Sequence, residues 1–478
     1  MRPAAATTIN TISVIDNATG RPAAGRRHSG TLHMTTTSDE RPYWDAKLET
    51  QSRADWGALK LSLLQKHIAH AYAGSPAYRA AFDAAKVSPA QIKSLDDIRR
   101  FPFIDKRTLR DRQLAVPPFG DLVAVPEQDI VYISASSGST GVPTASPFTQ
   151  SDFDGWIDYE ARQFWSSGMR PSDRYVHSLN FSLFIGGPCV LGAQKLGALT
   201  IHAGTIPSDR LLQILRQFQA TVIWTTPSYA WYLGETAIKE GYDLRKDLAV
   251  RRIFVAGEPG GSIPETRNRI EQLWGASVYD YYGLSDIFGS CAGMCEQKEG
   301  LHWAEDHILV EVIDPDSGEP VKPGDRGEMV LTTLKKTARP MIRFRTGDIV
   351  SFNPEPCRCG RTAIRLNGVH GRRDDMLIIK GVNLFPSDVE AVARQDHELT
   401  GEYRLVVDRI NHLDRLTVEV EHIHGYNGAP ETLADRFERK LKAVTGVSAA
   451  VSVLKPDTLP RATHKAKRVE DRRSGVWS

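Results

Sequence analysis

The sequence predicts an α/β protein: a large N-terminal body of several subdomains, built on mostly parallel sheets, followed by a small mobile α+β domain. Strand-like and helix-like segments alternate through the middle of the chain, hairpin-like segments follow them, and a separate α+β pattern comes last. The chain has 478 residues, about three times the length of a usual domain of ~150 residues. We therefore expect two or three compact cores.

The helical start and the alternating part of the chain predict the body. Apolar residues recur at helical spacing over residues 56–73, and a second helical stretch covers residues 77–85. The strands expected next are 130–134, 174–179, 220–225, 252–256 and 277–281, and the helices expected between them are 152–166, 211–219 and 265–274. Such alternation predicts βαβ units, which bind ligands at the carboxyl ends of their strands.

Beyond about residue 304 the pattern changes to hairpins and then to a third region. Strands are expected at 308–313, 327–334 and 341–344, with a turn at 314–318. The third region carries expected strands at 403–408, 415–421 and 450–454 and an expected helix at 430–444. The predicted parts are a disordered tail over residues 1–42, the large body over 43–370 and the small domain over 371–478.

Charge and apolar content exclude several classes of protein. Sixty Lys and Arg residues against 58 Asp and Glu residues give a net charge of +2, which offers no electrostatic case for nucleic acid or an anionic membrane as a partner. No apolar run reaches the ~18 residues that span a bilayer, and five cysteines are too few for a disulfide scaffold. We expect a cytoplasmic protein, and hypothesise that Met34 rather than Met1 is the true start.

The segment Ser-Ser-Gly-Ser-Thr-Gly at residues 136–141 directly follows an expected strand. Its glycines free the backbone and its hydroxyl groups surround exposed amides, which suits a phosphate chain. On composition alone, a flexible linker is the more common explanation. The chain has neither a G-x-x-x-x-G-K-[ST] loop nor a strand-linked G-x-G-x-x-G motif, which disfavours P-loop NTPases and ordinary dinucleotide enzymes.

Further motifs follow this loop in a fixed order. They are Ala256-Gly-Glu-Pro259, Asp280-Tyr-Tyr-Gly-Leu-Ser-Asp286, Arg343-Phe-Arg-Thr-Gly-Asp348, Gly371-Arg-Arg-Asp-Asp375 with Lys380-Gly381, and Leu459-Pro-Arg-Ala-Thr-His-Lys-Ala-Lys-Arg468. With the loop, they resemble the adenylate-forming superfamily of acyl-CoA synthetases, and most of all its phenylacetate-CoA ligase branch, over residues 43–473. The resemblance implies the acyl-adenylate-forming enzyme fold and an aryl-CoA ligase that uses ATP, Mg2+ and coenzyme A.

The resemblance also implies a nucleotide site. The loop at 136–141 would hold the β and γ phosphates, and the stretch at 256–259 would enclose adenine together with Tyr281 and Tyr282. Asp348 would accept both ribose hydroxyls, and Arg372 would contact the ribose and phosphate side. The full predicted ATP site is Ser136, Ser137, Gly138, Ser139, Thr140, Gly141, Ala256, Gly257, Glu258, Pro259, Asp280, Tyr281, Tyr282, Gly283, Ser285, Asp348 and Arg372.

Two positions near the phosphates depart from the pattern of this family. Asp286 stands where the family usually has Glu, so we expect it to help place Mg2+ through a shorter carboxylate. Val142 stands where the phosphate loop usually has Lys, so one cation facing the leaving pyrophosphate is missing.

The C-terminal motifs imply the residues of catalysis and of domain rotation. Lys465 matches the catalytic lysine of the family, whose cation would bridge the substrate carboxylate and the α-phosphate, although His464 stands where the family has Gly. The alternative for this segment is an exposed basic tail. Asp374 matches the hinge, and Lys380 and Gly381 would enter the site for thioester formation.

The acid pocket follows only by analogy with the family. Its expected walls are Tyr132, His177, Asn180, Phe181, Phe184 and Gly187, with Tyr281 beside them. Each of these aromatic residues is as readily explained as part of an ordinary core beside a sheet. A hydroxy- or aminobenzoate is the first expectation, a phenylacetate the second, and a fatty acid is disfavoured.

Four of the five cysteines lie in two short clusters. Cys291 and Cys295 are separated by three residues, Cys357 and Cys359 by one, and His302 follows the first cluster. Thiolates together with His are the ligand types of a tetrahedral structural Zn2+ site. The resemblance implies Cys295, His302, Cys357 and Cys359 as the zinc ligands, whereas free buried thiols are the alternative.

Together these residues predict an ATP- and Mg2+-dependent enzyme that converts an aromatic acid to its CoA thioester through an acyl-AMP. Transfer to a carrier-protein phosphopantetheine or to an amine is the alternative with the same first step. A non-catalytic nucleotide-binding regulator is the alternative from another class. The expected partners are the acid, ATP and coenzyme A, with no nucleic acid or membrane; a carrier protein and a homodimer remain open.

Overall fold

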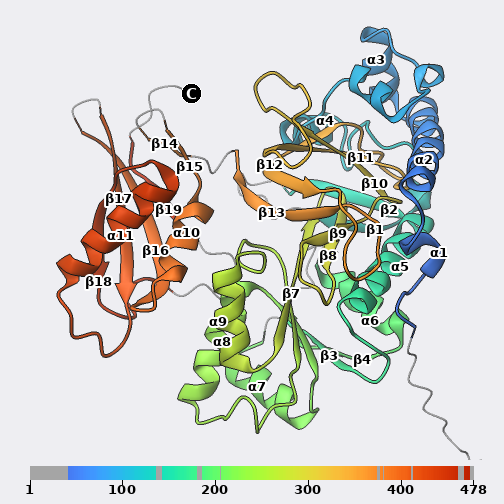
Figure 1. Ribbon diagram of the computed structural model, residues 1–478. Coiled ribbons are helices and arrows are strands. Elements are labelled where there is room, and N and C mark those ends of the chain that lie inside the picture. The colour runs from blue at the N-terminus through green and yellow to red at the C-terminus, as the bar shows by residue number, and fades with distance from the viewer. Residues whose placement is uncertain are drawn as a thin grey trace, which may run out of the picture. The chain divides into compact units, whose positions relative to one another are not determined.

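The computed structural model describes residues 41–135, 143–179, 186–204, 206–373, 377–379, 382–410, 413–460 and 468–473 (Figure 1). The tail predicted over residues 1–42 lies outside these ranges except for its last two residues. The phosphate loop at 136–142 lies outside them as well.

The chain begins with helices, as the apolar periodicity predicts. Ser52 accepts a hydrogen bond from the backbone N–H of Asp55 and so caps the long second helix, whose Leu64, Ile68 and Ala71 are fully buried at helical spacing. The helices of this part are α1 (Ala46–Glu49), α2 (Arg53–Gly74), α3 (Pro76–Ala84), η1 (Pro89–Gln91), η2 (Leu95–Arg100), α4 (Lys106–Ala115) and η3 (Glu127–Asp129).

Five parallel strands form one half of a large sheet, with helices on both faces (Figure 1). Tyr175, Trp224 and Phe254 point into the core shared with α5, whereas Val176, Ile223 and Ile253 point into the core shared with α7–α9. The elements are α5 (Gln150–Ser166), β3 (Arg174–His177), η4 (Gly187–Cys189), α6 (Val190–Leu196), β4 (Leu199–His202), α7 (Ser208–Gln217), β5 (Val222–Thr225), α8 (Pro227–Lys239), β6 (Arg252–Val255), α9 (Pro264–Trp274) and β7 (Ser277–Leu284).

The same sheet continues beyond β7 in antiparallel strands. Over the described residues its order is β10-β11-β12-β13-β9-β8-β7-β6-β5-β3-β4, so the sheet as a whole is mixed and is parallel only from β7 to β4. The added strands are β8 (Phe288–Met294), β9 (Leu301–Trp303), β10 (Ile308–Ile313), β11 (Gly327–Thr333), β12 (Phe344–Asn353) and β13 (Arg365–Arg372). The strand predicted at 341–344 is wrong, since β12 begins where that segment ends, after Arg343 with its left-handed φ of 49°.

A separate hairpin leads into and out of the predicted phosphate loop. Strand β1 (Ile130–Ala135) pairs antiparallel with β2 (Ala145–Thr149). The loop therefore connects two hydrogen-bonded strands, whose described ends fix where it starts and stops.

The C-terminal part has its own hydrophobic core, drawn from residues between Leu377 and Val469. Its four-stranded sheet has the order β18-β17-β16-β19. Its elements are β14 (Leu377–Ile379), β15 (Val382–Leu384), α10 (Pro386–Gln395), β16 (Leu399–Ile410), β17 (Leu413–His422), α11 (Pro430–Thr445), β18 (Ala450–Leu454) and β19 (Val469–Asp471). A core of this kind agrees with a small α+β domain, while its boundary at residue 371 stays a prediction.

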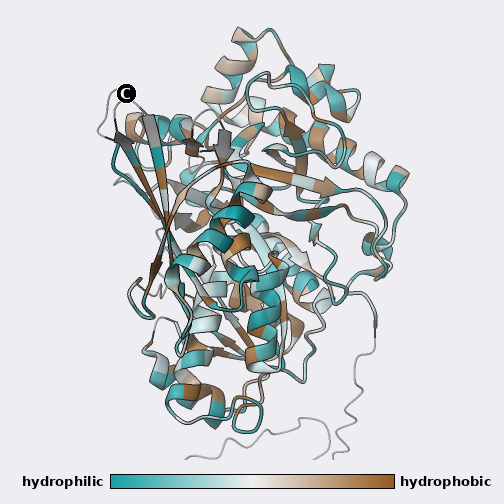
Figure 2. Cartoon of the chain, turned by 60° about the vertical axis from the view of Figure 1, so that its left-hand side comes forward, coloured by the Kyte–Doolittle hydropathy of each residue, from teal (hydrophilic) through white to brown (hydrophobic). Residues whose placement is uncertain are grey.

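Hydrophilic and hydrophobic residues alternate along the helices in Figure 2, as expected when one face of each helix is buried. Among the described helices, none combines the length and the apolar content that crossing a bilayer requires. The cytoplasmic location stays a prediction.

Candidate functional site

Three side chains of the predicted nucleotide site come together, although their strands β7, β12 and β13 are not all neighbours in the large sheet. The Tyr282 hydroxyl donates a hydrogen bond to Oδ2 of Asp348 at 2.5 Å. Arg372 pairs with Asp348 across β12 and β13, and its Nη1 lies 3.8 Å from Oδ1 of that carboxylate. Burial, with the neighbouring Asp348, raises the pKa of Tyr282 well above its ordinary value, so the hydroxyl remains a donor. The structure thus brings these predicted residues together around one carboxylate.

Tyr281 points away from this group, because adjacent residues of a strand face opposite sides. Its side chain is buried, its hydroxyl shares a hydrogen bond of 2.5 Å with Ser167 Oγ, and its ring centroid lies 4.8 Å from that of Trp224. Of the two tyrosines expected around adenine, only the side chain of Tyr282 lies beside Asp348.

The stretch 256–259 follows β6, at the carboxyl end of the parallel strands. Gly257 has φ of 92°, a conformation that suits glycine. Glu258 Oε1 accepts a hydrogen bond of 2.7 Å from the backbone N–H of Ser228, in the first turn of α8. Asp280, near the same edge, accepts a hydrogen bond of 2.5 Å from Ser262, and burial raises its pKa to about 7.

The turn between β7 and β8 contacts β1 and β2, the strands that flank the predicted phosphate loop. Ser134 Oγ, at the end of β1, donates to the Ser285 carbonyl, and Ser146 Oγ, in β2, donates to the Asp286 carbonyl, each at 3.3 Å. Gly283 has no space for a side chain, since a Cβ there would lie 1.6 Å from the Gly289 carbonyl oxygen. The turn that carries Asp286 is therefore packed directly against the strands that hold the loop.

The sequence analysis did not predict two buried cations that lie near Asp286. Lys336 and Arg339 lie between β11 and β12, and both are fully buried. Arg339 Nη2 lies 3.8 Å from Oδ1 of Asp286, which is itself buried. Their sequence, Lys-Lys-Thr-Ala-Arg, has the composition of an exposed basic stretch, so nothing in it signals burial.

The predicted acid pocket is described at three of its positions. The half-buried Tyr132 on β1 has its ring centroid 5.0 Å from that of Phe153, and burial raises its pKa to about 12. His177 ends β3, shares a hydrogen bond of 2.8 Å with the Tyr175 hydroxyl, and has its pKa lowered to about 3 by burial, so its ring is neutral at pH 7. Gly187 begins η4, whereas Asn180, Phe181 and Phe184 lie outside the described residues.

A buried carboxyl near η4 was also missed. Glu160 on α5 is fully buried, and its Oε1 accepts hydrogen bonds from Trp156 Nε1 at 2.8 Å and from the Cys189 thiol at 3.2 Å. Burial raises the pKa of Glu160 to about 8, so this side chain is mostly a neutral acid at pH 7. Gly192 on α6 leaves room for it, because a Cβ there would lie 2.4 Å from Glu160 Cβ.

The four residues predicted to bind zinc converge, although they come from distant parts of the chain. The Sγ atoms of Cys295 and Cys357 are 3.7 Å apart, Cys359 Sγ lies 3.3 Å from His302 Nε2, and the four ligand atoms are all within 4.8 Å of one another. Two sulfurs on a tetrahedral Zn2+, with Zn–S bonds of about 2.3 Å, are about 3.8 Å apart. We call these residues the Cys/His cluster; the donor set and its spacing fit zinc.

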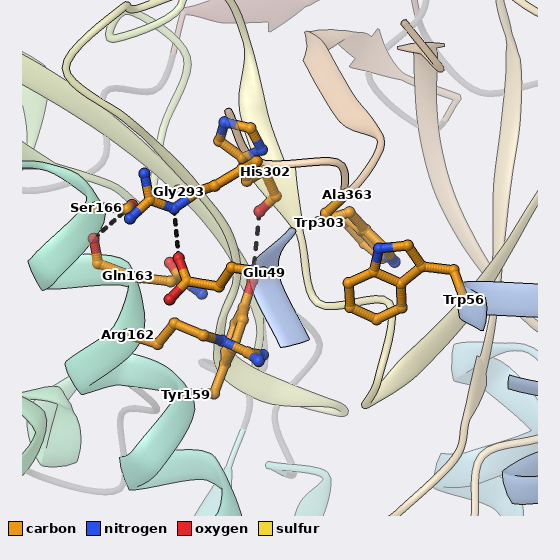
Figure 3. Close-up of a pocket in the computed structure, with 11 residues that line it drawn as sticks. Glu49, Trp56, Tyr159, Arg162, Gln163, Ser166, Gly293, His302, Trp303 and Ala363 are labelled. Carbon is orange, nitrogen blue, oxygen red and sulfur yellow. Dashed lines mark hydrogen bonds and ion pairs between the residues drawn. The ribbon is translucent and has the colours of Figure 1, made fainter. Parts of the chain in front are cut away.

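A cavity of about 30 Å³ adjoins this cluster and is lined by Tyr159, Arg162 and His302, among others (Figure 3). The Tyr159 hydroxyl donates to the His302 carbonyl at 3.3 Å. His302 Nδ1 is buried and has no hydrogen-bond partner among the described residues.

The remaining predicted residues cannot be placed. Lys465, the hinge residue Asp374, and Lys380 with Gly381 lie outside the described ranges, as does the whole loop Ser136–Gly141. Their roles stay predictions.

Two family descriptions match long parts of this chain. The family description "AMP-binding enzyme" matches residues 66–334, and "AMP-binding enzyme C-terminal domain" matches residues 381–473. The chain is 38% identical to a phenylacetate-coenzyme A ligase of Aromatoleum evansii, over 89% of this chain and 96% of the relative. It is 36% identical to the phenylacetate-coenzyme A ligase of Escherichia coli (strain K12), over 90% of this chain and 98% of the relative.

Solved structures resemble the chain as well. A 2-hydroxyisobutyryl-CoA ligase in its postadenylation state, in complex with 2-HIB-AMP, has a TM-score of 0.85 at 34% identity, covering 91% of this chain and 93% of that one. The same ligase in its thioesterification state, with 2-HIB-AMP and CoA, has a TM-score of 0.69 at 35% identity and the same coverage.

Proposed function

Because the chain belongs to the AMP-binding enzymes, and within them to the phenylacetate-CoA ligase-like acyl-CoA ligases, we propose that it activates an aromatic carboxylic acid with ATP and passes the acyl group to coenzyme A. The observation that carries this proposal is the grouping of Tyr282 on β7 with Asp348 and Arg372 on β12 and β13 of the same sheet, with Asp286 in the turn after β7. A carboxylate held by a tyrosine and faced by an arginine suits a ribose diol next to a phosphate.

In this proposal each half of the nucleotide has its own residues. Asp348 accepts the two ribose hydroxyls, Tyr282 holds that carboxylate in place, and Arg372 contacts the phosphate side. The residues also fit Mg2+, since Oδ1 of the buried Asp286 has no hydrogen-bond partner among the described residues and a carboxylate is a normal ligand of this ion. Mg2+ bound there would neutralise charge on the phosphates.

The chemistry proceeds in two steps. An oxygen of the substrate carboxylate attacks the α-phosphorus, the bond from that phosphorus to the bridging oxygen breaks, and pyrophosphate leaves with the electron pair, giving acyl-AMP. The thiol of coenzyme A then loses its proton and displaces AMP from the acyl carbon. We assign Lys465 to charge stabilisation in the first step and Asp374, Lys380 and Gly381 to the domain rotation before the second.

The two states of the structural relative support a rotation of this kind in the family. The same ligase gives TM-scores of 0.85 and 0.69 against this chain in its two named states, so its own parts move between them.

For the acid we propose an aromatic ring held between Tyr132 and the segment that begins η4, with neutral His177 near a polar substituent. Because aromatic and polar groups are mixed here, we propose a hydroxy- or aminobenzoate as the first choice of acid and a phenylacetate as the second. For the Cys/His cluster we propose a structural Zn2+ bound by all four residues, since four protein ligands leave no open position for chemistry.

Pyrophosphate exchange into ATP, measured with a panel of aryl acids, tests the function. Exchange that depends on one acid is expected, and AMP release with that acid should then require coenzyme A. AMP release that requires a phosphopantetheinyl carrier protein or an amine instead would replace coenzyme A as the acceptor. ATP binding without exchange for any acid would favour a non-catalytic binder and contradict the proposal.

A further inference from the structure

Arg339 is a fully buried cation at the end of the predicted phosphate loop. Its guanidinium donates through Nη1 to the carbonyl of Ala145, the first residue of β2 and three residues after Val142. Nη2 lies 3.8 Å from Oδ1 of Asp286, beyond hydrogen-bond distance. Nε and Nη2 have no hydrogen-bond partner among the described residues.

The neighbouring cation Lys336 is bonded very differently. Its Nζ donates to Ser146 Oγ at 2.5 Å and to the carbonyls of Asp286 and Ile287 at 3.3 and 3.0 Å, and it lies 4.0 Å from the Phe148 ring centroid. All three donors of its ammonium therefore have protein partners. Lys336 joins the turn after β7 to β2 by hydrogen bonds, whereas Nε and Nη2 of Arg339 donate to no described residue.

Buried polar atoms without partners are rare in folded proteins, and each one requires an explanation. Here two donor atoms of Arg339 and one acceptor atom of Asp286 are left over within the same few ångströms. A phosphate oxygen would satisfy the guanidinium, and a divalent cation on that phosphate would satisfy the carboxylate. The leftover groups thus have the complementarity of a magnesium-bound phosphate.

We propose that Arg339, beside the first residue of β2, supplies the cation that Val142 does not provide and binds the β and γ phosphates of ATP. The inference rests on the proposed function, because it takes ATP as the nucleotide. When the bond between the α-phosphorus and the bridging oxygen breaks, the negative charge gained by pyrophosphate develops next to a guanidinium that is already fixed in position. A fixed cation stabilises that charge without reorganisation.

The competing explanation gives Arg339 a purely structural role, joining β2 to the Asp286 turn through its bond to Ala145. The two explanations differ in their ligand dependence. A phosphate-binding cation affects ATP and leaves AMP, which lacks the β and γ phosphates, unchanged. A structural arginine affects both nucleotides alike.

The experiment measures the Kd of ATP and of AMP by calorimetry, with Mg2+, for the full chain and for Arg339→Met. ATP binding should weaken about tenfold or more, while AMP binding changes less than twofold. Lys335→Met is the matched control: it removes a partly exposed cation of the same segment, which pairs with Asp306 rather than with Asp286, and should change neither Kd. Equal weakening of ATP and AMP binding, or none, would overturn the proposal.

A second site tests the same idea by rescue. Adding Val142→Lys to Arg339→Met restores the family's loop cation and should recover most of the lost ATP affinity, which a structural role would not allow. In the otherwise unchanged chain, Val142→Lys should tighten ATP binding less than threefold, because the cation is already supplied. A tenfold gain there contradicts the proposal even if Arg339→Met fails to fold.

These outcomes separate the inference from the function on which it rests. Acid-dependent pyrophosphate exchange by the unchanged chain, together with unaltered ATP binding in Arg339→Met, rejects the role of Arg339 alone. No ATP binding by the unchanged chain rejects both.

Discussion

The nucleotide site and the Cys/His cluster both follow from sequence motifs, yet their polar atoms are arranged in opposite ways. In the cluster, the four ligand atoms all lie within 4.8 Å of one another. Around Asp286 and Arg339, buried atoms lie close together but leave hydrogen-bonding capacity unused. The cluster thus has the arrangement that a bound ion would stabilise, whereas the atoms around Asp286 and Arg339 keep hydrogen-bonding capacity that a ligand could satisfy.

Removing the carboxylate of Asp348 should have the largest effect on activity. Asp348→Ala leaves the ribose hydroxyls and Arg372 without their partner, so kcat/KM for ATP in pyrophosphate exchange should fall at least about 100-fold. Zinc content should stay unchanged, since the cluster uses other residues. A kcat/KM within a factor of three of that of the unchanged chain would show that Asp348 does not contact ATP.

Removing one ligand of the Cys/His cluster should have the next largest effect, on stability. Cys357→Ser should lose the bound zinc and lower the melting temperature by about 10 °C or more. Elemental analysis and thermal unfolding check this, with Cys291→Ser as the control because its buried thiol faces the Phe288 carbonyl. Protein purified without chelator that contains no metal would contradict the zinc assignment.

The two adjacent tyrosines of β7 allow a smaller and sharper test. Tyr282→Phe removes the hydrogen bond to Asp348 and should raise KM for ATP about tenfold. Tyr281→Phe removes the bond to Ser167 on the other face and should change stability while leaving KM for ATP within about twofold. The opposite result would reverse the faces assigned to the two residues.

The smallest expected effect concerns Glu160, a buried group outside both regions. Its pKa of about 8 in the fold exceeds the ordinary value of 4.5, so between these pH values the folded state holds a proton that the unfolded state releases. Stability from this group is therefore complete below pH 4.5 and is lost as pH rises toward 8. Glu160→Gln should remove this dependence, gaining roughly 2 °C in melting temperature relative to the unchanged chain between pH 6 and pH 8. Parallel pH curves for the two proteins would show that Glu160 is not protonated in the fold.

The sequence predicted what is local or carried by motifs. The alternating βαβ pattern, the helices of the N-terminal part and the strands of the small domain are confirmed. Asp348, Arg372 and Tyr282 could be named because each lies within a short motif, and the Cys/His cluster because thiols and histidine are a restricted set of ligands.

What the sequence did not reveal depends on contacts between distant segments. Arg339 lies in a segment whose composition predicts exposure to solvent. It is buried because it packs against β2, where it bonds to Ala145, 194 residues earlier in the chain. Glu160 lies on a helix where a carboxylate normally faces water, and Gly192 on another helix creates its space. The antiparallel half of the sheet was seen only as hairpins, because pairing such as that of β13 with β9 joins segments that are not neighbours in the sequence.

Strand β7 belongs to both halves of the sheet, pairing parallel with β6 and antiparallel with β8. Its successive side chains serve different purposes: Tyr282 faces Asp348, and Tyr281 packs among the aromatic residues on the other side. In protein engineering, the packing of the core at Tyr281 and the contact with Asp348 at Tyr282 can therefore be changed separately. Substitutions of the aromatic residues packed around Tyr281 should alter the core, whereas a substitution of Tyr282 should alter the contact with Asp348.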